Sequence, residues 1–281
     1  MSKLFEGRLN RIYDFVKQYY MNKLANDYIY DDGVNRAKFA LQAFNYMVNL
    51  CGYFDKPRVV EDDVYKTFQS IELYRGVSKA KHHKELLNKP KNYYPGVGMF
   101  GYGIYFASIK NDALYYASNS RRKVMKCKIS SPNIITSEIL TQYRRMIYKG
   151  KTDEMFLKTD TFIKFNTLNY ELNHEDRCKE NWCNFDFKND IEKIKKLNEF
   201  IENIKFPAIR NLYKEVFVEN VSNIAILLGY DLIQVKPNFT FFSLLNRSKI
   251  VVSKKEYNRL SNLSLIDKLE GLSKKDEFVA E

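Results

Sequence analysis

The chain has 281 residues, enough for one large domain or two smaller ones, and its 45% hydrophobic content with 15% aromatic residues excludes a disordered protein. No apolar run approaches the roughly 18 residues of a membrane span, the first residues lack a signal-peptide core, and four cysteines make no secreted disulfide framework, so we expect a cytoplasmic protein without membrane contact. The net charge of +12 favours polyanionic partners, chiefly nucleic acid, although the codon bias of an AT-rich genome would also enrich lysine.

Residues 1–70 form an N-terminal helical region in this interpretation. Apolar residues recur at helical spacing over 4–20 and again over 39–48, with a turn at 31–33 between them. Nothing in this region suggests catalysis, so we expect a cap or a partner-docking layer.

Short strands begin at Ile71. The sequence predicts strands over 71–76 and 124–129, with a helix over 111–118 between them. A Lys- and His-rich stretch at 79–91 is assigned no element.

The segment Met99–Ser108 joins a Gly-x-Gly to an aromatic and aliphatic strand that ends at a small polar residue. Glycines let the backbone approach a ligand closely, and the Ile-Tyr-Phe run is typical of a buried strand. A hairpin glycine pair entering a core strand is the alternative.

A basic run extends over 121–158, which contains ten Lys or Arg residues and three acidic residues. Tyr143, Tyr148 and Phe156 lie within it, which is the mixture that phosphate contact and base stacking would use. The sequence therefore predicts contact with nucleic acid through residues 121–158.

Residues from about 150 to 208 are polar and charged, with a helix near 191–204, and we interpret them as an insertion into the strand-rich domain. His174, Cys178 and Cys183 have spacing that zinc could use, with Cys127 as a distant fourth ligand, but free thiols are the favoured interpretation and no metal is expected.

The strand-rich pattern resumes near residue 220. A helix over 220–228 precedes strands over 232–235, 239–245 and 250–252. Residues 254–281 are charged and are expected to form a peripheral helix or a loose tail.

Three motifs together resemble the ADP-ribosyltransferase superfamily. They are Leu73-Tyr74-Arg75-Gly76, the Gly101–Ala107 run, and Tyr116, eleven residues after Tyr105. The likeness is to the poly(ADP-ribose) polymerase and diphtheria-toxin branch, with Arg75 in place of the first motif's histidine. It covers about 71–130, with a weaker continuation over 220–253, and implies an α+β fold: a split antiparallel β-sandwich core over 71–253, with an N-terminal helical region and a helical insertion.

The resemblance implies that NAD is the substrate. Two tyrosine rings, Tyr105 and Tyr116, would sandwich the nicotinamide, and the Gly76 backbone would pair with its carboxamide. Arg75 would hold the diphosphate or ribose hydroxyls, and Ser108 would orient Arg75 or a ribose oxygen. The expected NAD contacts are Arg75, Gly76, Gly103, Tyr105, Phe106, Ser108 and Tyr116.

Two departures from the family pattern limit the expected chemistry. Ala113 replaces the pocket serine, and the segment 239–247 contains no acid that could serve as the family's catalytic glutamate. Asn246 is the candidate substitute and Asp231 an alternative, so the expected catalytic residues are Arg75, Tyr105 and Asn246. Without the glutamate, one ADP-ribose would be transferred rather than a polymer.

The sequence thus predicts a mono-ADP-ribosyltransferase that modifies a macromolecule. Nucleic acid fits the charge, and resemblance to toxins of phage-defence toxin–antitoxin systems implies an antitoxin partner. A protein side chain as acceptor, a degenerate module that only binds ADP-ribose or nucleic acid, and a structural phage-encoded protein with an attached transferase domain remain alternatives.

Overall fold

The structure is a computed structural model of the chain. It describes residues 3–25, 33–53, 55–68, 70–88, 96–98, 101–118, 120–150, 186–235 and 240–263. All statements below concern these residues.

Helices form two groups along the chain. Those with printed bounds are α1 (Lys3–Ala25), α2 (Gly33–Leu50), α3 (Asp62–Thr67), α4 (Lys81–Asn88), α5 (Lys110–Tyr116), α6 (Ser137–Lys149), α9 (Phe187–Glu202), α10 (Pro207–Val218) and α11 (Val221–Leu228), with short 3₁₀ turns η1 (Arg121–Lys123) and η2 (Arg247–Lys249). Residues 254–263 form a further helix, here called the C-terminal helix.

The strands of the described residues form one mixed sheet in the order β1-β9-β5-β2-β4-β8-β7-β6, with β3 paired to β4 off this path. Their bounds are β1 (Arg58–Val60), β2 (Ile71–Gly76), β3 (Gly96–Gly98), β4 (Gly101–Ala107), β5 (Val124–Ile129), β6 (Ile134–Thr136), β7 (Leu232–Val235), β8 (Phe241–Leu244) and β9 (Ile250–Ser253).

The α+β class is confirmed, but the sheet differs from the expected split antiparallel sandwich. Two pairings, β1 with β9 and β6 with β7, are parallel. The halves β1-β9-β5-β2 and β4-β8-β7-β6 meet at one registered pair, Tyr74 opposite Ala107. Hydrogen bonding therefore weakens between β2 and β4, although the path of strands is continuous.

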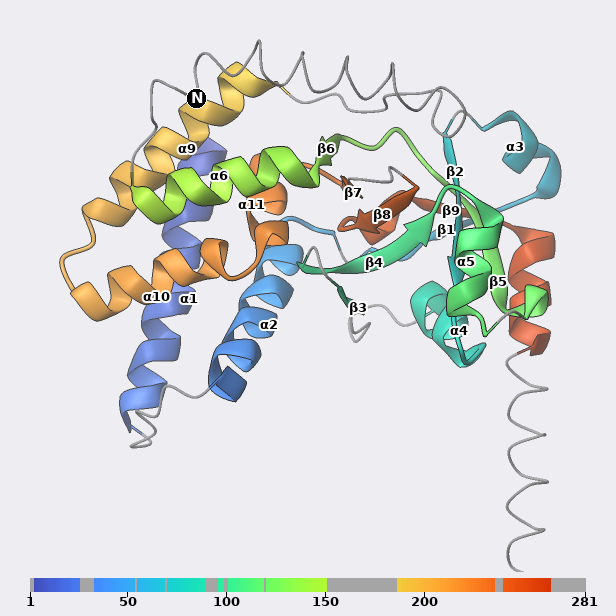
Figure 1. Ribbon diagram of the computed structural model, residues 1–281, viewed down its shortest axis with the longest axis horizontal. Coiled ribbons are helices and arrows are strands. Elements are labelled where there is room, and N and C mark those ends of the chain that lie inside the picture. The colour runs from blue at the N-terminus through green and yellow to red at the C-terminus, as the bar shows by residue number, and fades with distance from the viewer. Residues whose placement is uncertain are drawn as a thin grey trace, which may run out of the picture.

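A layer of helices covers the β6–β7 end of the sheet. Apolar side chains of α1, α2, α6, α9, α10 and α11 share one core with Ile135 of β6 and Ile233 of β7 (Figure 1). Within the expected N-terminal helical region 1–70, α1 and α2 pack with later helices of the chain, and β1 adds a strand to the sheet. The part of the expected insertion that is described, α9, belongs to the same core; residues 151–185 lie outside the described residues.

The other face of the sheet has its own core, which includes Leu86 and Leu87 of α4 and Leu260 of the C-terminal helix. All three are fully or almost fully buried. The described part of the predicted tail is thus a packed helix and not a loose end.

A third, small cluster lies under α5. It joins Ala113 and Ala117 of α5 to Ala107 of β4 and Val124 of β5. Small residues let this helix lie close to β2, and this cluster lies beside the candidate site. None of the described helices is long and apolar enough to span a bilayer.

Candidate functional site

Tyr105 lies on the face of the sheet that α5 covers. Side chains alternate between the faces of a strand, so Tyr105 shares a face with Ala107, which is part of the α5 cluster. Tyr105 is half-buried, and its hydroxyl donates to the Gly101 carbonyl at 2.7 Å. The ring is therefore tied down along its own strand.

Gly76 lies under α5 at the end of β2. A Cβ there would overlap the Ala113 carbonyl oxygen and approach the Ala117 nitrogen to 3.0 Å. Only glycine lets helix and strand approach this closely, and the overlap involves backbone that cannot rotate away.

Tyr116, at the end of α5, extends the same face. Its ring meets Phe241 of β8 edge-on, with centroids 6.1 Å apart, and Phe241 pairs with Ala107. The side chain remains 56% exposed, so most of the ring surface is open to a ligand. Gly76, Tyr105 and Tyr116 thus lie on one face of the sheet, and their joint role as a nicotinamide slot stays a prediction.

Buried polar groups lie behind the Gly101–Gly103 segment. A Cβ on Gly103 would overlap the Ser243 hydroxyl, and one on Gly101, where φ is +93°, would meet the Asn220 and Ser222 side-chain oxygens. The Ser243 hydroxyl is fully buried and finds no hydrogen-bond partner among the described residues. Sequence reasoning missed Ser243 and Asn220, because each reads as part of a strand or a helix cap.

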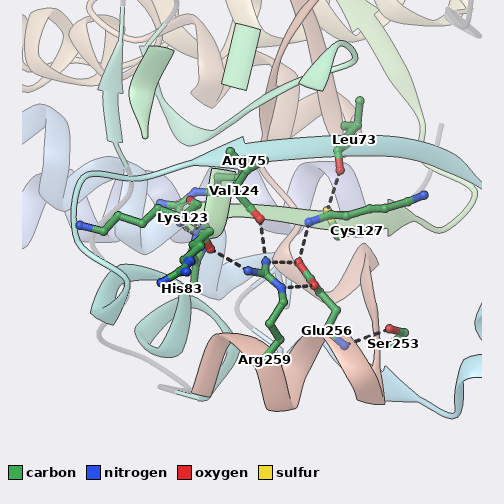
Figure 2. A network of polar contacts seen from close by, with 11 residues as sticks. Leu73, Arg75, His83, Lys123, Val124, Cys127, Ser253, Glu256 and Arg259 are labelled. Atoms are coloured by element: carbon green, nitrogen blue, oxygen red, sulfur yellow. Dashed lines mark hydrogen bonds and ion pairs between the residues drawn. The ribbon is translucent and has the colours of Figure 1, made fainter. Parts of the chain in front are cut away.

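Arg75 lies on the opposite face, which corrects the prediction that it shares the slot with Tyr105. Its neighbour Tyr74 faces Ala107, so alternation points Arg75 toward α4. There its Nη1 lies 3.4 Å from Nδ1 of His83 (Figure 2). The side chain is half-buried.

His83 is a titratable residue beside Arg75 for which the sequence predicted no role. It is fully buried, and burial together with the Arg75 charge lowers its pKa to about 3. Nε2 lies 2.9 Å from the Lys123 carbonyl, which only accepts, so Nε2 carries the proton and Nδ1 accepts from Arg75. A neutral His83 therefore connects the Arg75 guanidinium to the backbone of η1 and orients it.

Two further predicted contacts do not face the slot. Phe106 is almost fully buried in the core shared with Leu73 and α4. Ser108 bonds the Thr240 carbonyl through its backbone nitrogen at 2.7 Å and its hydroxyl at 3.4 Å. Both follow from strand alternation, which places every second residue on the other face.

Asn246 and Asp231, the candidates for the third catalytic position, bond to each other. Asn246 Nδ2 donates to Asp231 Oδ1 at 2.6 Å, and Asn246 Oδ1 accepts from both the backbone and the hydroxyl of Ser248. Asp231 also accepts from the Asn133 nitrogen and lies 3.4 Å from Lys249 Nζ. Both residues therefore stabilise the corner between β7, β8 and η2, and the catalytic role predicted for Asn246 stays a prediction.

The basic run is divided by the fold. Residues 121–128 lie in η1 and β5 beside α5, whereas Arg144, Arg145 and Tyr148 lie on α6 in the helical layer (Figure 1). Residues 151–158 lie outside the described residues. The described residues of the predicted nucleic-acid contact over 121–158 therefore lie in two different parts of the fold, and the contact itself stays a prediction.

The thiols give no metal site in the described chain. No group of three metal-ligating side chains occurs among the described residues, and Cys127 is a fully buried thiol 3.7 Å from the Leu73 carbonyl. His174, Cys178 and Cys183 lie outside these residues.

Comparison with known proteins adds no relative: no family model, curated protein or solved structure matches the chain.

Proposed function

We propose that the protein is a mono-ADP-ribosyltransferase that cleaves NAD and transfers one ADP-ribose to a macromolecular acceptor. The observation that carries this proposal is that Gly76, Tyr105 and Tyr116 all lie on the face of the sheet that α5 covers.

The three residues offer the contacts that would bind a flat aromatic ring carrying an amide group. A half-buried tyrosine held by its own hydroxyl and an exposed tyrosine at the helix end offer two ring faces for the nicotinamide. The backbone of Gly76 would pair with the carboxamide.

In the proposed reaction, the bond between nicotinamide nitrogen and ribose C1′ breaks, and its electron pair leaves with nicotinamide. The ribose passes through an oxocarbenium-like state, as in glycoside hydrolysis, and an acceptor nucleophile bonds C1′ and releases its proton. The slot residues orient the leaving group. Arg75 lies on the other face, so its proposed contact is limited to the diphosphate beyond the strand end.

A second function, binding of NAD or ADP-ribose without turnover, is favoured by one specific observation. Asn246 and Asp231 satisfy each other in a structural corner and do not offer a polar group to the ribose. A slot that holds the ring without such a group would bind NAD and leave it intact.

The experiment uses NAD labelled in its adenylate phosphate with separate RNA, DNA and protein acceptor pools, and calorimetric titration of NAD. A transferase labels one pool, and Tyr105→Ala lowers labelling on the order of 10- to 100-fold, because it removes one ring face while Tyr105→Phe keeps it. Tyr148→Ala, an exposed tyrosine on α6, is the matched control and should label as wild type does.

Binding that is lost in Tyr105→Ala, without label in any pool, would favour the binding module. Absence of both binding and label in the folded protein would overturn the NAD site itself.

A further inference from the structure

The end of the sheet beside the proposed slot carries a concentrated positive surface. Neither 73–84 nor 113–137 contains an acidic residue. The exposed basic side chains of these two stretches include Lys79, Lys81, Arg121 and Arg122. We call these four residues, with Tyr115 and Tyr116, the η1 surface.

Hydrogen bonds hold the segments of the η1 surface together. The Lys123 carbonyl accepts from the Val77 nitrogen at 3.3 Å and from His83 Nε2 at 2.9 Å, and the Lys123 ammonium donates to the Ser78 carbonyl at 3.0 Å. These contacts fix the loop before α4 against η1, and Figure 2 shows His83 beside Lys123. The charges therefore sit on a rigid platform.

Two tyrosines next to these charges are exposed. Tyr115 is 80% and Tyr116 56% exposed, and their rings meet at 88° with centroids 5.5 Å apart. Among the described residues, the only ring contact recorded for Tyr115 is with Tyr116. An exposed aromatic face together with exposed Arg and Lys side chains suits a base that stacks while its phosphates meet the cations.

We propose that the η1 surface binds single-stranded nucleic acid, and that this strand is the acceptor for ADP-ribose. The acceptor role rests on the proposed function, because Tyr116 belongs to both the slot and the η1 surface. A strand stacked on Tyr115 would bring its nucleotides next to the site of NAD cleavage. A duplex, whose bases are already stacked, would gain only the charge contacts.

The test measures binding of the full chain to fluorescent 20-nucleotide RNA and DNA single strands and to their duplexes, by anisotropy over a series of salt concentrations. Arg121→Ala/Arg122→Ala should weaken single-strand binding about 10-fold or more and reduce the salt slope by about 1.4, since each phosphate contact contributes about 0.7. Tyr115→Ala should weaken it about 5- to 100-fold with the salt slope unchanged, and Tyr115→Phe should bind as wild type does.

The matched control is Arg144→Ala/Arg145→Ala, an exposed basic pair on α6 with the same change in net charge. It should bind as wild type does. Equal weakening in both double variants, tighter binding of duplex than of either single strand, or no binding of either strand would overturn the proposal.

The binding measurement requires no NAD turnover, so the two proposals fail separately. Strand binding without any labelling leaves the η1 surface standing and removes the transferase. Labelling of the protein pool without any strand binding leaves the transferase standing and overturns the proposed binding of nucleic acid by the η1 surface.

Discussion

Gly103 and Ser243 form a contact in which a glycine makes room for a hydroxyl. The Ser243 oxygen occupies the place of a Gly103 Cβ, and the Ser243 Cβ and Leu244 carbonyl lie 3.3 Å from that point. The hydroxyl is buried and lacks a partner among the described residues, which costs free energy in the absence of a ligand. The pair therefore requires glycine at position 103, because any side chain there would displace the Ser243 hydroxyl.

Gly103→Ala should destabilise the fold by about 1–3 kcal/mol, because the added methyl overpacks against Ser243. In a Ser243→Ala background the same substitution should cost clearly less, while Ser243→Ala alone should change stability by less than about 1 kcal/mol. Urea denaturation of the four proteins completes the cycle. Equal costs of Gly103→Ala in both backgrounds would contradict the contact.

At the scale of elements, the C-terminal helix closes the sheet end that carries η1. Arg259 donates to the Arg122 and Val124 carbonyls at 2.7 Å each and to Glu256, while Glu256 accepts from the Lys126 nitrogen at 3.0 Å (Figure 2). The helix thereby satisfies backbone groups at the beginning of β5 and covers the α4 face.

Arg259→Ala should destabilise the protein by about 1–3 kcal/mol, because two carbonyls lose a charged donor. Asn258→Ala, an exposed neighbour on the same helix, is the control and should change stability by less than about 0.5 kcal/mol. Thermal unfolding measures both. Matching melting temperatures for the two variants would show that the helix is held by apolar packing alone.

At the scale of the molecule, two buried titratable groups oppose each other in their pH dependence. His83, on the α4 face, has its pKa lowered from 6.5 to about 3 by burial and by Arg75. Asp190, in the helical layer, has its pKa raised from 3.8 to about 6 by burial, although it accepts from the Tyr143 and Tyr230 hydroxyls at 3.2 and 2.6 Å. Each of the two cores therefore buries a titratable side chain whose charged form is disfavoured by burial.

The signs follow from proton linkage. Between pH 6.5 and 3 the unfolded chain binds a proton at His83 that the folded chain does not, so stability falls as pH falls, by roughly 5 kcal/mol at the limit. Between pH 6 and 3.8 the folded chain binds a proton at Asp190 first, so stability rises as pH falls, by roughly 3 kcal/mol.

Relative to wild type, His83→Gln should therefore gain stability as pH falls from 6.5 to 4, whereas Asp190→Asn should lose it. Asp190→Asn should also be the more stable protein at pH 7, because the buried charge is gone. Denaturation curves from pH 4 to 8 test both. Parallel pH profiles in wild type and either variant would contradict the assigned burial.

The elements that local patterns define were predictable from the sequence. Strands 71–76, 124–129 and 232–235 are confirmed with the predicted bounds, because β-branched and aromatic runs between turn residues need no distant partner to be recognised. The helix α4 was missed because Lys and His mask its buried stripe of His83, Leu86 and Leu87. The helix α6 was missed because basic residues lie between the apolar residues of its buried side and obscure their helical spacing.

The sequence by itself determined the α+β class and the order of most elements, since short motifs and periodicity are local properties. Only the tertiary structure decided which face each side chain occupies. Register between strands placed Arg75 against His83 instead of Tyr105, and the corner around Asp231 used the polar groups of Asn246. Those outcomes depend on partners distant along the chain, and no local pattern encodes them.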